Sequence, residues 1–311
     1  MTKILIPLML LLFPLYLHAQ SAEDYYEDGI EAFQKGKYKA SIKATDKALA
    51  IDAHTWEYYQ LKADCYMELE DYYQVLQTYN KGIEENPQSY HLHNNRGNFY
   101  YLAHKFRAAD RDFTKALEYA STDSMKVRAY INRAAVYLAT REWQDAKDDL
   151  LIAYDMDSNS TGVLNNLANA TDELGDTEKA IEYLERALEI DSTQFETYTN
   201  IGFLYQQLER YEEAIKYFDK TLEVSKDNPY GYSNRAYNKY KLGDIKGAMT
   251  DINKSIKFFP ENSYAHKVRA LILIEQGKRD QACEELDEAL RLGYLEMYGD
   301  EATLLKEEHC Y

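Results

Sequence analysis

Proline and glycine are scarce in this sequence. Only 5 of its 311 residues are proline and 13 are glycine. Linkers between domains are typically rich in glycine, serine or proline, and no stretch of that composition divides the chain. The scarcity therefore predicts a single elongated domain rather than several domains joined by linkers.

Basic residues are few relative to acidic ones. The chain has 36 lysines and arginines against 53 aspartates and glutamates, a formal charge of −17, or −17 − 1 = −18 without Lys3. Nucleic acids and anionic membrane surfaces require clustered cations. The composition therefore excludes a nucleic-acid partner, and the simplest role of the excess acids is to keep the chain soluble.

The signatures of catalysis and metal binding are missing from the sequence. It has no glycine-rich phosphate loop, no nucleophile elbow and no cysteine pair at metal-ligand spacing. His91 and His93 lie two residues apart on an expected helix, where their side chains point about 200° away from one another, and His104 falls on a turn. We expect no bound metal, no cofactor and no enzymatic activity.

What the chain does contain is a pair of short amphipathic helices in residues 161–194. Apolar and small residues recur at steps of three and four in the first helix, Gly175 ends it, and Asp176 is a start signal for the second. Small residues allow two helices to approach to about 8–10 Å. The two apolar faces consist of Leu164, Leu167, Ala168 and Thr171 in the first helix, and of Ala180, Leu184 and Ala187 in the second.

This pair of helices recurs along the chain every 34 residues. The repeats are 22–55, 56–89, 90–123, 127–160, 161–194, 195–228, 229–262 and 263–296, with residues 124–126 as an insertion. In 195–228, for example, the matching offsets hold Tyr198, Gly202, Tyr205, Tyr211, Ala214 and Phe218. A 34-residue period with small, aromatic and proline residues at such offsets resembles the tetratricopeptide repeat, and the resemblance covers about 22–296.

The resemblance implies an all-α fold, in which eight helical hairpins stack into a right-handed superhelix. One face of each first helix then lines a concave groove. Asp300 is a start signal for a last helix, so we expect residues 297–311 to form a C-terminal capping helix over the end of the stack.

Asparagine recurs at one groove position in five successive repeats. An amide side chain offers two donors and an acceptor, which suits the main chain of an extended peptide. The alternative is that these amides bond to neighbouring helices and hold the stack in register. Together with two further asparagines and three aromatic residues, the predicted peptide-binding residues are Asn95, Asn98, Asn132, Asn166, Asn169, Asn200, Phe203, Asn234, Tyr237 and Tyr264.

Arg128 is the only basic residue at the relevant groove positions. The family's best-known peptide site clamps two carboxylates with lysine, asparagine and arginine, but here Asn165, Glu196 and Tyr230 stand at basic places. The resemblance therefore implies a neutral, hydrogen-bonding groove with aromatic patches. Arginines that directly follow the groove position are expected along the seam between helices with acidic partners; these are Arg96, Arg133, Arg235 and Arg269.

Residues 1–19 have the pattern of a secretory signal peptide. Lys3 precedes an apolar run that ends at the small Ala19, so we expect cleavage after Ala19 or Gln20 and a periplasmic or secreted protein that is not inserted in the membrane. The alternative is a membrane anchor, but the run is near the lower limit of about 17 residues and contains Pro7 and Pro14.

The three cysteines differ in their expected roles. Cys65 lies within an expected first helix and is most simply a small core residue. A bond between Cys283 and Cys310 would close a loop of about 27 residues, fasten the capping helix and contribute roughly 3–4 kcal/mol, in a compartment that permits disulfides. The alternative is two free thiols.

These patterns together predict a non-catalytic scaffold that binds a peptide or protein segment of the cell envelope in its groove. The alternative is a glycan-binding or cell-wall-binding module that uses the tyrosines and asparagines of the groove. The sequence leaves the identity of the partner and the oligomeric state open, because many unrelated roles use the same solenoid.

Overall fold

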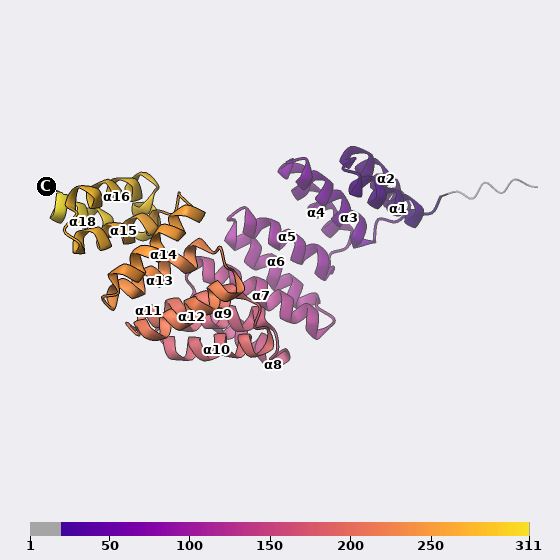
Figure 1. Ribbon diagram of the computed structural model, residues 1–311. Coiled ribbons are helices and arrows are strands. Elements are labelled where there is room, and N and C mark those ends of the chain that lie inside the picture. Colours follow the sequence, from indigo (N-terminus) through magenta and orange to yellow (C-terminus); the bar gives the residue numbers. More distant parts are fainter. Residues whose placement is uncertain (1–19, 311) are drawn as a thin grey trace, which may run out of the picture. The chain divides into compact units, whose positions relative to one another are not determined.

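The computed structural model describes residues 20–310 (Figure 1). Within them, all regular structure is helical, which confirms the predicted all-α class. The predicted signal peptide, residues 1–19, lies outside the described residues. None of the described helices is both long and apolar enough to cross a membrane.

The chain divides into two compact units between Ser121 and Thr122. Unit 1 contains α1 (Ala22–Gln34), α2 (Tyr38–Ile51), α3 (Trp56–Glu68), α4 (Tyr72–Glu85), α5 (Tyr90–Leu102) and α6 (Phe106–Tyr119). Unit 2 contains α7 (Asp123–Thr140), α8 (Trp143–Met156), α9 (Thr161–Glu173), α10 (Thr177–Ile190), α11 (Phe195–Gln207), α12 (Tyr211–Val224), α13 (Pro229–Lys241), α14 (Ile245–Phe258), α15 (Ser263–Glu275), α16 (Arg279–Arg291), α17 (Tyr294–Tyr298) and α18 (Glu301–Cys310).

The boundary between the units falls where the 34-residue period is interrupted. The absence of linkers predicts a single domain, but the structure has two compact units. No linker separates them, because the inserted residues 124–126 are part of a helix. They lie in the first turn of α7, which has 18 residues, whereas α9, α11, α13 and α15 have 13 each.

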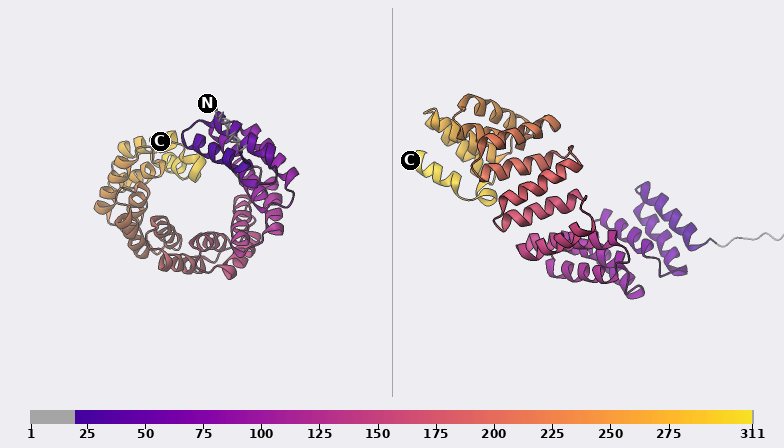
Figure 2. Two further views of the ribbon diagram at one scale, coloured as in Figure 1. Left: turned by 90° about the vertical axis from the view of Figure 1, so that its right-hand side faces the viewer. Right: turned by 90° about the horizontal axis from the view of Figure 1, so that it is seen from below.

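Consecutive helices form hairpins, and the hairpins stack within each unit. The most extensive contacts join the two helices of one hairpin, such as α9 with α10, and each second helix also packs against the first helix of the next hairpin, as α12 does against α13. Figure 2 shows the successive helices of unit 2, coloured from magenta through orange to yellow, side by side in sequence order.

The turn inside each hairpin requires a residue with positive φ. Among residues 20–310, glycine fills this place in four hairpins, at Gly36, Gly175, Gly243 and Gly277, and the other four hairpins use Glu70, His104, Arg141 and Glu209. Glycine adopts this conformation without steric cost. As predicted, Asp176 then caps α10, since its carboxylate accepts a hydrogen bond from the Lys179 amide at 3.2 Å.

Small residues of the first helix face large residues of the second helix in most hairpins, although in the first hairpin Gly29 faces Thr45. A Cβ atom on Gly202 would lie 2.8 Å from Phe218 Cε1, and one on Gly97 would lie 2.7 Å from the same atom of Phe113. In the other four hairpins of unit 2, the small residue is alanine and the large residue is leucine or isoleucine. These fully or nearly buried pairs are Ala134 with Leu150, Ala168 with Leu184, Ala236 with Ile252 and Ala270 with Leu286.

Buried ion pairs join the helices at the seam, as predicted from the recurring arginines. The Arg235 guanidinium donates to both carboxylate oxygens of Asp251 at 2.7 Å and to Asp219 Oδ1, on the preceding second helix, at 2.7 Å. The equivalent pairs, each 16 residues apart, are Arg96 with Asp112, Arg133 with Asp149 and Arg269 with Glu285.

Two repeats of unit 2 replace this ion pair with an apolar contact. Leu167 and Ile201 stand where other repeats have arginine, and both are fully buried. Tyr183 and Tyr217 stand where those repeats have the acidic residue, and they pack against the cores that contain Leu167 and Ile201. In these two repeats both members of the ion pair are replaced together. The replacement therefore leaves no unpaired charge at these buried positions.

The C-terminal segment contains two helices where one was predicted. α18 begins directly after Asp300, as expected, and packs on α16. The short α17 was not predicted because its five residues are too few to show a periodic pattern, and Gly293 and Gly299, both with positive φ, bound it.

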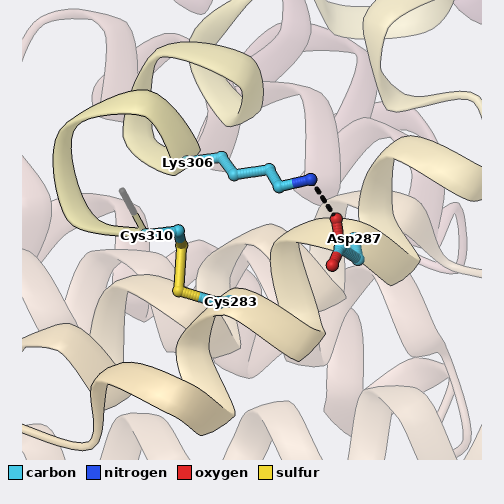
Figure 3. Close-up of a disulfide and its surroundings, with 4 residues drawn as sticks. All are labelled: Cys283, Asp287, Lys306 and Cys310. Carbon is cyan, nitrogen blue, oxygen red and sulfur yellow. Dashed lines mark ion pairs between the residues drawn. A yellow bond between two sulfur atoms is a disulfide. The ribbon is translucent and has the colours of Figure 1, made fainter.

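The predicted disulfide bond between Cys283 and Cys310 is present, with a Cα–Cα distance of 5.8 Å (Figure 3). It joins the end of α18 to α16, and an ion pair between Lys306 and Asp287 joins the same two helices at 2.5 Å. Cys65 is buried and unbonded, in agreement with its expected place in the core.

The small–large contact can be tested by substitution. We expect Gly202→Ala to lower the free energy of unfolding by about 1–3 kcal/mol, because the new methyl group overlaps the Phe218 ring. Gly202→Ala combined with Phe218→Leu recreates the pair found at Ala168 and Leu184. The double variant should lose less than the sum of the two single losses in urea unfolding, and strict additivity would contradict the pairing.

Acidification should weaken the seam. Burial by itself raises the pKa of the Asp251 carboxyl, but the hydrogen bonds and charges of Arg235 and Lys239 outweigh burial and hold this pKa below its ordinary value. A lowered pKa contributes stability above the ordinary value, and that stability is lost as the pH falls through the folded-state pKa. We expect the free energy of unfolding to drop below about pH 4.

The Asp251→Asn variant isolates this contribution. It should be less stable than the native protein at pH 7 and should lose less further stability on acidification, as measured by urea unfolding between pH 7 and pH 3. Glu189→Gln, which removes an exposed partner of Arg186, is the control and should keep the native pH profile. An unchanged acid dependence in Asp251→Asn would rule out this role for the seam.

The disulfide bond predicts a specific labelling pattern. The denatured protein should take up one alkyl label per chain before reduction, at Cys65, and three labels after it. Reduction should lower the free energy of unfolding by about 3 kcal/mol, and a variant with Cys283→Ser and Cys310→Ser should no longer respond to the reductant. Three labels before reduction would show that the bond does not form.

Candidate functional site

A cavity of about 370 Å³ lies between α9, α10 and α11 in unit 2. We call it the amide pocket, because five of its lining residues are asparagine or glutamine. The lining consists of Asn165, Asn166, Ala168, Asn169, Asp172, Glu173, Leu184, Asn200, Phe203, Leu204 and Gln207. Four of the predicted peptide-binding residues are thereby brought together in one place: Asn166, Asn169, Asn200 and Phe203.

Helical periodicity explains how these side chains converge. Asn166 and Asn169 are three residues apart on α9, and Asn200, Phe203 and Gln207 follow at steps of three and four on α11, so each set shares one helix face. The buried Leu184 and Leu204 contribute apolar lining. Phe203 remains 45% exposed, so its ring is available to a ligand.

The amides of the pocket are open to a partner. Within residues 20–310, the side chains of Asn166, Asn169, Asn200 and Gln207 form no hydrogen bond with another residue. Asn165 differs, because it donates to Gln194 and accepts from the Thr197 hydroxyl. The pocket therefore combines amides that have no partner within the described residues with one aromatic face.

The alternative role for the asparagines, holding neighbouring helices in register, fits Asn95 in unit 1. Its amide donates to the Gln60 side chain on α3. Gln60 stands 35 residues before Asn95, and the residue at the same distance before Asn166 is Ile131, whose side chain has no hydrogen-bonding group. The same repeat position is thus structural in unit 1 and open in the amide pocket.

The remaining predicted asparagines are less informative. Asn98 is exposed on α5 of unit 1, and Asn132 and Asn234 are half-buried on α7 and α13 of unit 2. The Asn234 carbonyl accepts a hydrogen bond from the buried Asn238, whose amide also donates to Gln206 at 2.7 Å. None of the three lines the amide pocket.

Two carboxylates at the end of α9 were not anticipated from the sequence. Asp172 and Glu173 line the pocket from the last turn of this helix. They follow Asn169 by three and four residues, so the periodicity that groups the asparagines could have included them. Asp172 accepts a hydrogen bond from the Thr177 hydroxyl at 2.7 Å, which orients one of its oxygens.

Tyr237 and Tyr264 belong to a different environment from the one predicted for a groove. Both rings contact the ammonium of Lys267, at 5.2 and 5.3 Å from their centroids, and Tyr294 of α17 lies 5.9 Å from it. Tyr264 also packs against Tyr298. The chain's own C-terminal segment therefore packs on Tyr264, and Tyr237 packs on Tyr264 in turn.

Lys267 is the most buried lysine at this end of the molecule, with 2% of its surface exposed. Burial lowers the pKa of its ammonium, although the Glu301 carboxylate at 2.7 Å opposes that shift. Glu301 begins α18. The ion pair, together with the tyrosine rings, fixes the C-terminal helices on α15 and supplies a packing role for Tyr237 and Tyr264.

Larger hollows lie elsewhere, and in one of them the lysines pair with acidic residues of the same lining. One of about 520 Å³ in unit 1 is lined by Lys62, which pairs with Asp46 at 2.6 Å, and by Lys81, which pairs with Glu85 at 2.5 Å. In the described part of the chain, no cluster of His, Cys, Asp and Glu side chains is arranged to hold a metal ion. The amide pocket differs from that hollow in bringing together four of the predicted peptide-binding residues.

Comparison with known proteins identifies the repeat. Residues 57–89 and 195–228 match the tetratricopeptide repeat family, and residues 168–209 match a TPR repeat family. RNA polymerase II-associated protein 3 of Xenopus laevis is 25% identical over 129 residues, which are 42% of this chain and 19% of that protein.

Two solved structures share the fold over nearly the whole chain. A tetratricopeptide repeat protein from Parabacteroides merdae has a TM-score of 0.60 at 18% identity and covers 93% of this chain and 100% of its own. The APC/C hetero-tetramer Cut9–Hcn1 has a TM-score of 0.63 at 17% identity, covering 94% of this chain and 56% of that one.

The stacked hairpins, with their recurring small–large contacts and seam ion pairs, define a helical-repeat solenoid. The chain is a tetratricopeptide repeat protein. Solenoids of this kind are scaffolds for protein interaction and present extended binding surfaces.

Proposed function

We propose that the protein is a non-catalytic scaffold that binds an extended segment of a partner protein in the amide pocket. The observation that carries this proposal is the set of unpartnered amides on α9 and α11, at Asn166, Asn169, Asn200 and Gln207. Each amide offers both donors and an acceptor, which match the carbonyl and N–H groups that an extended peptide leaves unpaired.

The apolar part of the pocket suits a side chain of the same peptide. Phe203 is partly exposed, and Leu184 and Leu204 add apolar lining. The volume of about 370 Å³ lies within the range of about 300–1,000 Å³ that is usual for ligand sites. Because stacking holds α9 and α11 in place, little conformational entropy is lost on binding.

We also propose that the protein is exported and that its partner belongs to the cell envelope. The apolar segment after Lys3 supports export. The disulfide bond between Cys283 and Cys310 supports it independently, because such bonds persist in oxidising compartments.

A second candidate function is glycan binding. Tyr230 on α13 is 48% exposed and Tyr298 on α17 is 49% exposed, so aromatic faces are available near the C-terminal end of unit 2. An array of oligosaccharides separates the two candidates, because glycan binding predicts retention of sugars that Tyr230→Ala abolishes and that changes in the amide pocket leave intact.

The peptide-binding proposal is tested with a displayed library of unstructured peptides. Peptides selected on the native protein should bind the Asn166→Ala/Asn200→Ala variant about tenfold more weakly, since about two hydrogen bonds of roughly 0.5–1.5 kcal/mol each are lost. Fluorescence anisotropy measures the dissociation constants, and thermal melting checks that the variants are equally folded.

The matched control compares two single variants, in which alanine replaces asparagine at the same repeat position of two different repeats. Asn169→Ala changes the pocket and should weaken binding, whereas Asn98→Ala changes an exposed residue of unit 1 and should not. Equal binding by all the variants would show that the peptide does not occupy the amide pocket.

A further inference from the structure

The amide pocket has a distinct charge. Asp172 and Glu173 are its charged lining residues, and no lysine, arginine or histidine is among the eleven residues that line it. Both acids stand in the last turn of α9, at the negative end of the helix dipole. One end of the pocket is therefore strongly electronegative, while the amides at the other positions are neutral.

The protein does not neutralise these two carboxylates itself. Neither Asp172 nor Glu173 takes part in an ion pair within residues 20–310. The buried acids of the seam differ from these two carboxylates, because Asp112, Asp149 and Asp251 each form an ion pair with an arginine. In the two repeats that form the pocket, the seam arginine is replaced by Leu167 or Ile201, so no seam cation stands in these repeats.

A cationic side chain of a ligand has complementary partners in the pocket. The Thr177 hydroxyl holds one oxygen of Asp172 at 2.7 Å, which leaves the other oxygen to accept from a ligand. The exposed ring of Phe203 offers a face for the aliphatic stem of a lysine or the guanidinium plane of an arginine. Asn166 and Asn200 are available to the main chain on either side of that residue.

We propose that the amide pocket selects an extended peptide that carries a lysine or arginine side chain, and that this cation binds at Asp172 and Glu173. The inference rests on the proposed peptide-binding function and adds the chemistry of the partner. It is the opposite of a carboxylate clamp, because the protein supplies the negative charge and the partner supplies the positive one. The partner is then a protein with an exposed, extended basic segment.

The first test compares peptides on the native protein. Peptides selected from the library should be enriched in lysine or arginine at one fixed position. Replacement of that residue by norleucine, which keeps the aliphatic stem and removes the charge, should weaken binding about tenfold, and replacement by glutamate should weaken it further. Raising the salt concentration should weaken the basic peptide more than the norleucine peptide.

The second test compares variants of the protein. Asp172→Asn/Glu173→Gln should weaken the basic peptide about tenfold and leave the norleucine peptide unchanged. The control variant Asp227→Asn/Glu212→Gln removes the same two charges from exposed positions of unit 2 outside the pocket lining, and it should bind both peptides like the native protein.

The outcomes separate this inference from the function on which it rests. Selected peptides that bind through Asn166 and Asn200 without a basic residue, or that ignore Asp172→Asn/Glu173→Gln, would overturn the charge preference and leave the peptide-binding function standing. If the control variant lost as much affinity for the basic peptide as the pocket variant does, the effect would come from the overall charge of the protein. That result would also overturn the charge preference of the pocket. Failure of every peptide to bind would overturn both proposals.

Discussion

The contact between a small residue of the first helix and a large residue of the second is the constraint on which the repeat depends. The same space between the two helices is filled in two ways: by a glycine and a phenylalanine at Gly202 and Phe218, and by an alanine and a leucine at Ala168 and Leu184. Because this contact fixes the rotation of the first helix about its axis, every repeat in a unit turns the same face away from its hairpin. The convergence of α9 and α11 on one pocket follows from it.

The seam between the helices contains most of the ion pairs that are buried within the repeats. The Arg235 guanidinium donates hydrogen bonds to Asp251 and Asp219, which lie on two different second helices. These contacts pair the arginine and both carboxylates within the protein. Repeats with Leu167 or Ile201 gain the same packing without charge. In these repeats Asp172 and Glu173 line the amide pocket and form no ion pair within residues 20–310.

The C-terminal segment solves a different problem, the exposed end of the stack. A last repeat has no following hairpin, so its first-helix face must be covered by another part of the chain or by solvent. Here Tyr294 and Glu301 cover it, through the ammonium of Lys267 and the ring of Tyr264, and the disulfide bond fastens α18 on α16. The tyrosines at this end therefore serve packing, whereas the amides of α9 and α11 face outward.

The sequence by itself determined the helices of the hairpins, the 34-residue period and the seam arginines, because each depends on residues at fixed local spacings, whereas it left the bond between Cys283 and Cys310 as one of two alternatives. It also placed Asn166, Asn169, Asn200 and Phe203 on one surface. Only the tertiary structure decided which amides have a partner within the protein: the Asn95 amide donates to Gln60 on the preceding first helix, whereas the Asn166 side chain forms no hydrogen bond within residues 20–310 and Ile131 stands at the corresponding position 35 residues before it. Such partners depend on contacts between repeats, and a periodic pattern read within one repeat does not contain them.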